Sequence, residues 1–160
     1  MTGTWVLYLP YVKTYFGLND SEVGIALFSL AFGLLVSIPL IPYINRKLGV
    51  GRSTKLGIIL FALAFNLPLF ASNYLTLCSS LLLVGIFSGF TDISMNTLVT
   101  ELEKEDKKSF MSASHGFFSL GGVLAGLGSF LIGPLDNPPL HMLIAVLLVL
   151  VVNFIFHGKF

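Results

Sequence analysis

The sequence is poor in charged residues and in cysteine, and each shortage excludes a class of protein. Only 11% of its 160 residues are charged, whereas 55% are hydrophobic and the mean hydropathy is +0.90. An ordinary soluble domain carries about a quarter charged residues, so a water-soluble protein is excluded. Cys78 is the only cysteine, which rules out an internal disulfide and a cysteine-rich metal site.

Several constellations that carry chemistry are also missing. The three histidines lie far apart, and none has a second histidine or cysteine at metal-ligand spacing. No nucleophile stands with a base and an orienting group, and no carboxylate pair has a catalytic spacing. The net charge of +1 comes without a basic patch that would suit nucleic acid. We therefore expect no enzyme activity, no metal, no cofactor and no nucleic-acid partner.

What the sequence has is long apolar runs, separated by short polar segments. A membrane-spanning helix needs about 20 apolar residues, and lipid forces every backbone polar group to bond within the helix. The sequence therefore predicts an all-α, polytopic transmembrane bundle with five complete spans. These are residues 23–44, 56–71, 75–100, 110–132 and 140–156.

The first apolar stretch, residues 5–16, is too short to cross a bilayer and is interrupted by Pro10 and Lys13. It lacks the basic start and the small-residue cleavage site of a signal peptide. We interpret it as the end of a truncated first helix, and the whole chain, residues 1–160, as a single transmembrane domain. Asn19 with Glu22 three residues later predicts a capping box that opens the first complete span.

The polar segments predict the connections and the orientation. Residues 45–55 read as a tight basic loop, residues 101–108 as a solvated helix end and loop, and residues 133–139 as a proline-rich turn through which no helix continues. Alternate connections place eight basic residues on one side and Lys13 alone on the other, which by the positive-inside rule assigns the first side to the cytoplasm. The eight are Arg46, Lys47, Arg52, Lys55, Lys104, Lys107, Lys108 and Lys159.

The strongest functional signal is Asp92, an acid embedded in an otherwise apolar span, with Asn96 four residues later on the same helix face. A carboxylate at the centre of a membrane helix costs roughly 2.5 to 3.5 kcal/mol on insertion scales, so it usually faces a cavity and marks a pathway. Asp92 would take up a proton in one conformation and release it in another, or it would merely bond inside the bundle. Asn96 would bond to a solute hydroxyl, or it would join helices.

Three further side chains are weaker candidates for solute or proton binding. His115 lies near the cytoplasmic start of the fourth span, with Ser119 one turn later, and histidine exchanges protons near neutral pH. Near a helix end, a histidine more often bonds to a loop carbonyl. Tyr8 forms a helical stripe with Tyr11 and Tyr15, which suits either sugar stacking or an aromatic belt at the membrane interface.

Two pairs of glycines predict close helix packing. Gly85 with Gly89, and Gly122 with Gly126, are spaced four residues apart. Small residues let backbones approach, and this packing drives helix association in lipid. We expect contacts between spans of one bundle rather than a dimer interface.

The residues singled out so far, with others around them, resemble the major facilitator superfamily, and within it the fucose-permease-like branch of sugar porters. The resemblance covers nearly the whole chain and is most specific between Asp92 and Ser119. The matching residues are Trp5, Pro10, Gly17-Leu18, Ser21, Gly24, Gly49, Arg52, Gly89, Asp92, Met95-Asn96, Leu102-Glu103, Met111, His115-Gly116 and Phe118 to Gly122.

The resemblance implies that the chain is the N-terminal half of a twelve-helix transporter, from the end of helix 1 through helix 6. In that family two six-helix halves rock about a central site, giving alternating access. The acid at the position of Asp92 serves proton coupling or solute binding in similar porters. The connection that holds Arg46, Lys47, Gly49 and Arg52 resembles the family's gating loop, although an acid usually stands where this chain has Arg46.

These observations predict a secondary active transporter of a small polar solute, with sugar the best guess, driven by protons in a bacterial inner membrane. Its partners would be the lipid bilayer and either a second six-helix half or an identical copy. The alternative is a non-transporting membrane interaction or sensor protein, derived from a transporter half. The full reading frame around Met1 and Phe160 would discriminate the two hypotheses.

Overall fold

The computed structural model describes residues 2–132 and 137–155; for residues 2–4, 6, 7, 125, 126 and 128–132 it describes the backbone alone. Every regular element in these ranges is a helix, which confirms the predicted all-α class. The elements are α1 (Thr2–Phe16), α2 (Asp20–Leu48), α3 (Val50–Ala64), the short 3-10 helix η1 (Leu67–Phe70), α4 (Tyr74–Asp106), α5 (Met111–Ile132) and α6 (Pro138–Ile155).

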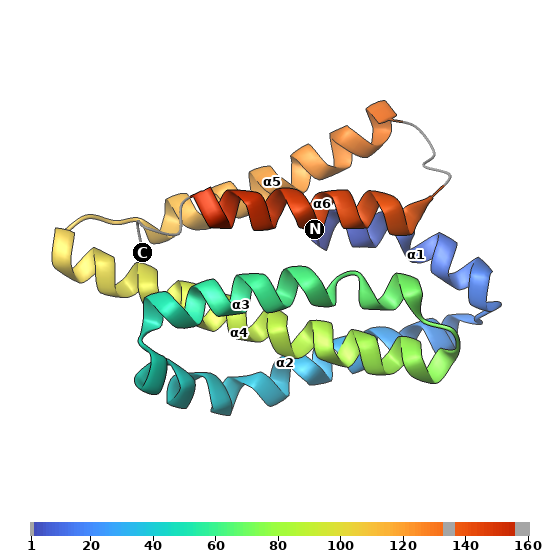
Figure 1. The fold of residues 1–160 in the computed structure, drawn as a ribbon, viewed down its shortest axis with the longest axis horizontal. Coiled ribbons are helices and arrows are strands. Elements are labelled where there is room, and N and C mark those ends of the chain that lie inside the picture. Colours follow the sequence, from blue (N-terminus) through green and yellow to red (C-terminus); the bar gives the residue numbers. More distant parts are fainter. Residues whose placement is uncertain (1, 133–136, 156–160) are drawn as a thin grey trace.

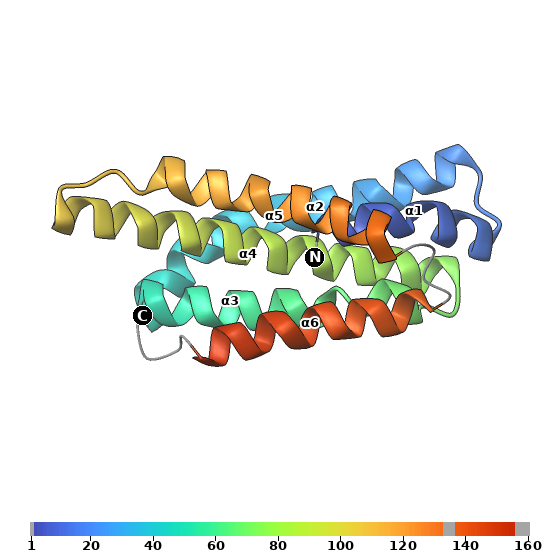
Figure 2. The same cartoon turned by 90° about the horizontal axis from the view of Figure 1, so that it is seen from above.

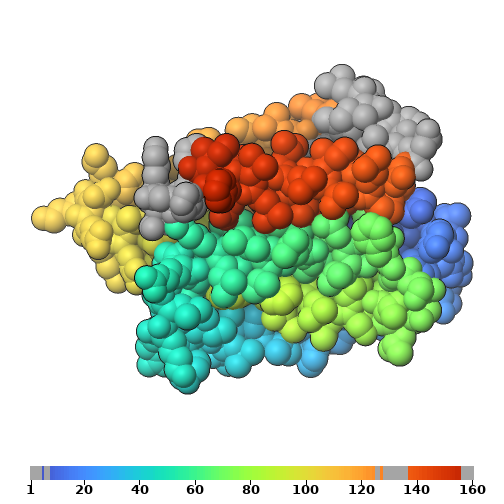
Figure 3. Space-filling view, viewed as in Figure 1, coloured from blue at the N-terminus to red at the C-terminus, as the bar shows by residue number. Residues whose placement is uncertain are grey.

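The helices run along one common direction, and α4 is the helix around which the others gather (Figures 1 and 2). It packs chiefly against α2 and α3, while α6 lies along α3 and α5 lies against α1. Figure 3 shows α6 resting on α3, with the end of α4 projecting beyond its neighbours. The core between these helices is apolar, and Leu77, Leu81, Val84, Met142 and Val146 are almost fully buried in it.

The α2–α3 and α4–α5 connections lie at the same end of the bundle (Figure 1). We call it the basic end, because six exposed basic side chains gather there: Arg46, Lys47, Arg52, Lys104, Lys107 and Lys108. The α1–α2 and α3–α4 connections lie at the opposite end, beside Lys13, whose ammonium group is 2.5 Å from the Asp20 carboxylate. The connections therefore alternate between the two ends as the sequence predicts.

Four helical segments in the described residues are long and apolar enough to cross a membrane, which is fewer than the five predicted spans. They are Asp20–Leu48, Val50–Phe70, Tyr74–Asp106 and Pro138–Ile155. The remaining predicted span corresponds to α5, whose 22 residues include much of the part described by backbone alone. Together with the many exposed large apolar side chains on α2, α5 and α6, the four segments identify an integral membrane protein.

The predicted loop at residues 45–55 is wrong. Helix α2 continues to Leu48 and α3 begins at Val50, so Gly49 alone, with φ of +82°, separates the two helices. The basic residues do not end the helix, because cations are favourable in the last turn, where the helix dipole is negative. Arg46 and Lys47 lie in that turn.

Two other boundaries differ from the prediction because of proline. The span at 56–71 is not one α-helix: α3 ends at Ala64, and Pro68 lies in η1. At the other turn, α6 begins at Pro138 with Pro139 next, since the first helical positions need no backbone N–H. The Asn137 side chain accepts from the Leu140 amide at 3.1 Å and caps this start. Residues 133–136 of the predicted turn lie outside the described residues.

The predicted capping box at the start of α2 is confirmed. The Asn19 side-chain oxygen accepts the Glu22 amide at 2.9 Å, and the Glu22 carboxylate accepts the Asn19 amide at 2.8 Å. Each bond satisfies a donor that the first turn of a helix leaves unpaired. This local signal therefore fixes where the first complete span begins.

Candidate functional site

Helix α4, which carries the candidates Asp92 and Asn96, packs against α2. Glycines at the contact determine how closely the two helices approach. A Cβ atom on Gly85 would lie 2.0 Å from the Leu30 carbonyl oxygen, and one on Gly89 would lie 1.9 Å from the Ser37 hydroxyl. From the other helix, a Cβ on Gly33 would lie 2.2 Å from the Leu82 carbonyl oxygen. At Gly33 and Gly85 the two backbones therefore approach each other directly, and at Gly89 the α4 backbone approaches the Ser37 side chain.

A buried polar bond completes the same crossing nearer the basic end. The Ser94 hydroxyl donates to the Asn45 side-chain oxygen at 2.8 Å, and both side chains are buried. Sequence reasoning missed Gly33, Ser94 and Asn45. A signal for Gly33 was present, since it is a small residue within an apolar run, but its partner on α4 could not be read from spacing.

The second predicted glycine pair differs in its surroundings. A Cβ on Gly122 would have no atom within 4 Å outside its own helix, and the surroundings of Gly126 lie outside the described residues. Among the described side chains of α5, those from His115 to Leu124 are exposed. A packing role for Gly122 and Gly126 stays a prediction.

Asp92 lies on the side of α4 that α1 covers farther along. Residues eleven apart lie on nearly the same side of a helix, and Leu81, eleven residues before Asp92, lines a small pocket together with Trp5 and Leu9 of α1. Figure 1 shows α1 extending from the opposite end only to the middle of the bundle. The Asp92 side chain is exposed, and within the described part of the chain it makes no hydrogen bond or ion pair.

Asn96 lies one turn farther towards the basic end, and its side-chain oxygen is buried without a hydrogen-bond partner. It lines a groove of about 420 Å³ with Thr97, Thr100, Glu101 and Lys104. The Thr97 and Thr100 hydroxyls donate to backbone carbonyls of their own helix at 2.7 and 2.8 Å, so they offer lone pairs to the groove. This groove can therefore accept hydrogen bonds from a polar solute.

A second groove, of about 490 Å³, adjoins the first and reaches the α2–α3 connection. Thr97 and Glu101 line both grooves, and Asn45, Arg46 and Gly49 line the second. Of the predicted gating residues, Arg46 and Gly49 thus border a hollow that leads to Asn96. Lys47 and Arg52 are exposed nearby, and the Lys47 ammonium group lies 4.6 Å from the centre of the Tyr43 ring.

His115 and Ser119 lie on α5, whereas Asp92 and Asn96 lie on α4. Both are exposed on α5, and the Ser119 hydroxyl donates to the His115 carbonyl at 3.1 Å. No hydrogen bond among the described residues joins either side chain to Asp92 or Asn96. Asp92 and Asn96 thus lie one turn apart on α4, and His115 and Ser119 lie one turn apart on α5.

Tyr8 is buried rather than open to a solute. Its hydroxyl forms a hydrogen bond with His141 Nδ1, and the two rings meet edge to face with centroids 5.8 Å apart. This bond links α1 to α6, and His141 was not among the predicted site residues. Its distance from Tyr8 in the sequence is the reason, since no local pattern joins two residues of different helices.

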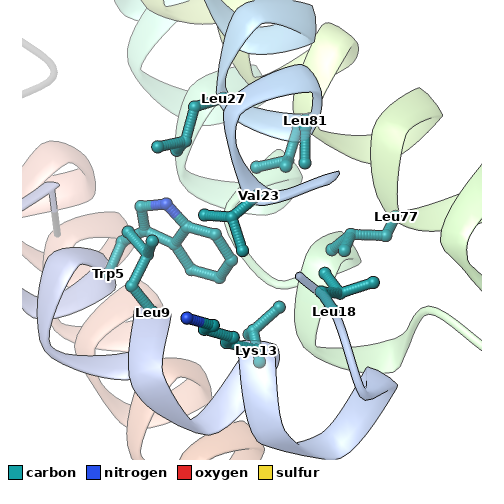
Figure 4. A pocket seen from close by; sticks show the side chains of 10 residues that line it. Trp5, Leu9, Lys13, Leu18, Val23, Leu27, Leu77 and Leu81 are labelled. Carbon is teal, nitrogen blue, oxygen red and sulfur yellow. The ribbon is translucent and has the colours of Figure 1, made fainter. Parts of the chain in front are cut away.

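A small pocket of about 20 Å³ lies between α1 and the first turns of α2 and α4 (Figure 4). Trp5 lines it with Leu9, Leu18, Leu77 and other mainly apolar side chains. The volume is close to that of one water molecule, but a bound water needs two to four polar partners. The pocket is too small and too apolar to bind a solute.

The described residues hold no group of three or more histidine, cysteine, aspartate or glutamate side chains that would bind a metal ion. The polar atoms in the two grooves are amide, hydroxyl, carboxylate, ammonium and guanidinium groups. Such a set binds polar solutes by hydrogen bonds and charge, and it contains no thiol or imidazole.

Comparison with known proteins matches the chain to one protein family. The model of the Major Facilitator Superfamily matches residues 1–158. An uncharacterized MFS-type transporter of Yersinia pestis is 27% identical over 150 residues, which are 94% of this chain and 39% of that protein. No solved structure matches the chain significantly.

Two further relatives match shorter parts of the chain. The membrane protein MosC of Rhizobium meliloti is 32% identical over 128 residues, 80% of this chain and 31% of its own length. An uncharacterized transporter of Sinorhizobium fredii is 28% identical over 138 residues, 86% and 37% of the two lengths. The chain thus spans between about a third and two fifths of these relatives.

Proposed function

This chain belongs to the major facilitator superfamily, and from that premise we propose that it forms one six-helix half, the N-terminal one, of a secondary active transporter. The transporter moves a small polar solute across the bacterial inner membrane by alternating access. Sugar is the best candidate class, as in the fucose-permease-like branch, and protons are the proposed coupling ion. A family of transporters also supports the prediction that the protein is not an enzyme.

The observation that carries the proposal is the placement of Asp92 and Asn96. A charged group in a membrane span is tolerated where it faces water or protein rather than lipid. Asp92 is exposed on the surface of this bundle, one turn from an amide oxygen without a partner and the groove beside it. In a complete transporter, this side of α4 would line the solute pathway between the two halves.

A second half, or an identical copy, is the proposed partner for this surface. The large apolar side chains on α5 support it, because they leave a wide face for helices or lipid. Those exposed on α5 are Phe117, Phe118, Leu120, Val123, Leu124 and Leu127. The same apolar face of α5 would also suit the alternative, a non-transporting interaction protein. The transport test below distinguishes the two.

The test is uptake of labelled monosaccharides, beginning with fucose, into vesicles that hold the full-length parent protein. Asp92→Asn removes the ionisable group but keeps the size of the side chain. We expect it to abolish accumulation driven by a proton gradient and to spare exchange of labelled for unlabelled solute across the membrane.

Asp106→Asn is the matched control, because Asp106 is exposed at the end of the same helix and outside both grooves. It should accumulate solute as the parent does. Unchanged accumulation in Asp92→Asn would remove the proton role, whereas absence of uptake of every sugar by the parent would remove the sugar assignment.

A further inference from the structure

The short connection between α4 and α5 is closed by one carboxylate. Helix α4 ends at Asp106 and α5 begins at Met111. The Glu103 carboxylate oxygen Oε1 accepts the Phe110 amide at 2.6 Å and the Met111 amide at 2.7 Å. The Ser109 hydroxyl donates to the same oxygen at 3.4 Å.

These bonds have the chemistry of a helix cap, but the capping group comes from the preceding helix. The first amides of a helix have no partner within it, and the positive end of the helix dipole favours an anion there. Glu103 supplies both an acceptor and a negative charge to the start of α5. Hydrogen bonds to an ionised carboxylate are among the stronger ones in proteins.

Little else holds this end of α5 to α4 in the described chain. Packing between α4 and α5 is slight, and α5 lies mainly against α1. Around the connection, Ser112 and Ala113 are exposed, while Met111 and Ser114 are half-buried. The connection also passes through Lys107, whose φ of 53° is left-handed, so its backbone needs other interactions to hold it.

We propose that Glu103 is a positioning residue that fixes the basic end of α5 on α4. Through this bond it sets the height of His115 and Ser119 on α5 relative to Asp92 and Asn96 on α4. The effect on transport rests on the proposed function, whereas the anchoring of α5 does not. Glu103 itself touches no solute.

The anchoring is tested by hydrogen exchange of single backbone amides, measured by NMR on the full-length protein in lipid nanodiscs. In Glu103→Ala, the Phe110 and Met111 amides should exchange about tenfold faster or more, since each loses a hydrogen bond to a charged group. Glu103→Gln keeps an acceptor oxygen and should restore part of the protection. Glu105→Ala, an exposed acid two residues away, should change neither amide.

A distance measurement shows whether α5 itself moves relative to α4, which faster hydrogen exchange of two amides would not show. Spin labels at Leu83→Cys on α4 and Ser112→Cys on α5, in a Cys78→Ser background, report the relative position of the two helices. Their distance distribution should broaden in Glu103→Ala and recover in Glu103→Gln. Unchanged amide exchange and an unchanged distribution in Glu103→Ala would overturn the anchoring.

The consequence for transport has its own readout. In Glu103→Ala the maximal rate of uptake should fall, while Glu103→Gln should keep more of it. A normal rate in a Glu103→Ala protein whose α5 amides are unprotected would overturn the role in setting the site. Failure of the parent to transport any solute would refute the proposed function and leave the exchange result standing.

Discussion

Single residues decide how close α2 and α4 come. At Gly33, Gly85 and Gly89 the neighbouring helix occupies the space of a missing side chain, and two of the three neighbours are backbone carbonyls. A carbonyl of a helix cannot rotate away as a side chain can. The crossing therefore depends on these positions more than on the apolar residues around them, which are interchangeable by comparison.

We expect Gly85→Ala to destabilise the protein by about 1 to 3 kcal/mol, because the added methyl group forces the two helices apart. Gly24→Ala is the control: it lies on the same pair of helices, in α2, with no atom within 4 Å of an added Cβ. It should be neutral or slightly stabilising, since alanine favours the helix by about 1 kcal/mol. Thermal unfolding in detergent compares the two, and equal stabilities would contradict the close crossing.

At the scale of an element, the connection from α4 to α5 contains the only left-handed residue that is not glycine in the described chain, Lys107. A side chain in this conformation costs roughly 1 to 2 kcal/mol relative to glycine. The sequence predicted a solvated, charged helix end here, and residues 104–109 are exposed in the structure, as that prediction requires. The reverse turn and the cap from Glu103 depend on the positions of both helices.

Lys107→Gly should raise the stability by up to about 1 kcal/mol, because the relief of backbone strain exceeds the entropy that glycine gives the unfolded chain. Lys107→Val should lower it, since a β-branched residue fits a left-handed backbone least well. Thermal unfolding followed by the fluorescence of Trp5 measures both. Lys108→Gly is the control, because it removes a lysine charge at the neighbouring position. A gain in stability as large as that of Lys107→Gly would show that backbone strain at Lys107 is not the cause.

At the scale of the whole molecule, the alternation of connections between two ends is what makes the orientation testable. The basic end holds the exposed lysines and arginines of two connections, and the opposite end holds Lys13 with its acidic partner Asp20. Anionic lipids and the membrane potential favour basic loops in the cytoplasm. The orientation with the basic end inside remains a prediction from this asymmetry.

Thiol labelling in intact cells tests the orientation on the full-length parent in a Cys78→Ser background. Ser72→Cys lies at the opposite end and Asp106→Cys at the basic end, and both positions are exposed. A reagent that cannot cross membranes should label Ser72→Cys in intact cells and Asp106→Cys only after permeabilisation. The reverse pattern would invert the proposed topology.

The sequence by itself determined the helical class, the membrane location, the alternating connections and the cap at Asn19, because hydropathy and capping are local properties of the chain. It misplaced the break at Gly49 and the start of α6, since single helix-breaking signals were weighed without their neighbours. Only the tertiary structure decided that Gly33 meets Leu82, that Ser94 bonds to Asn45 and that Tyr8 is buried against His141. These contacts join residues on different helices, and the spacing along one helix carries no information about which face of another helix it will meet.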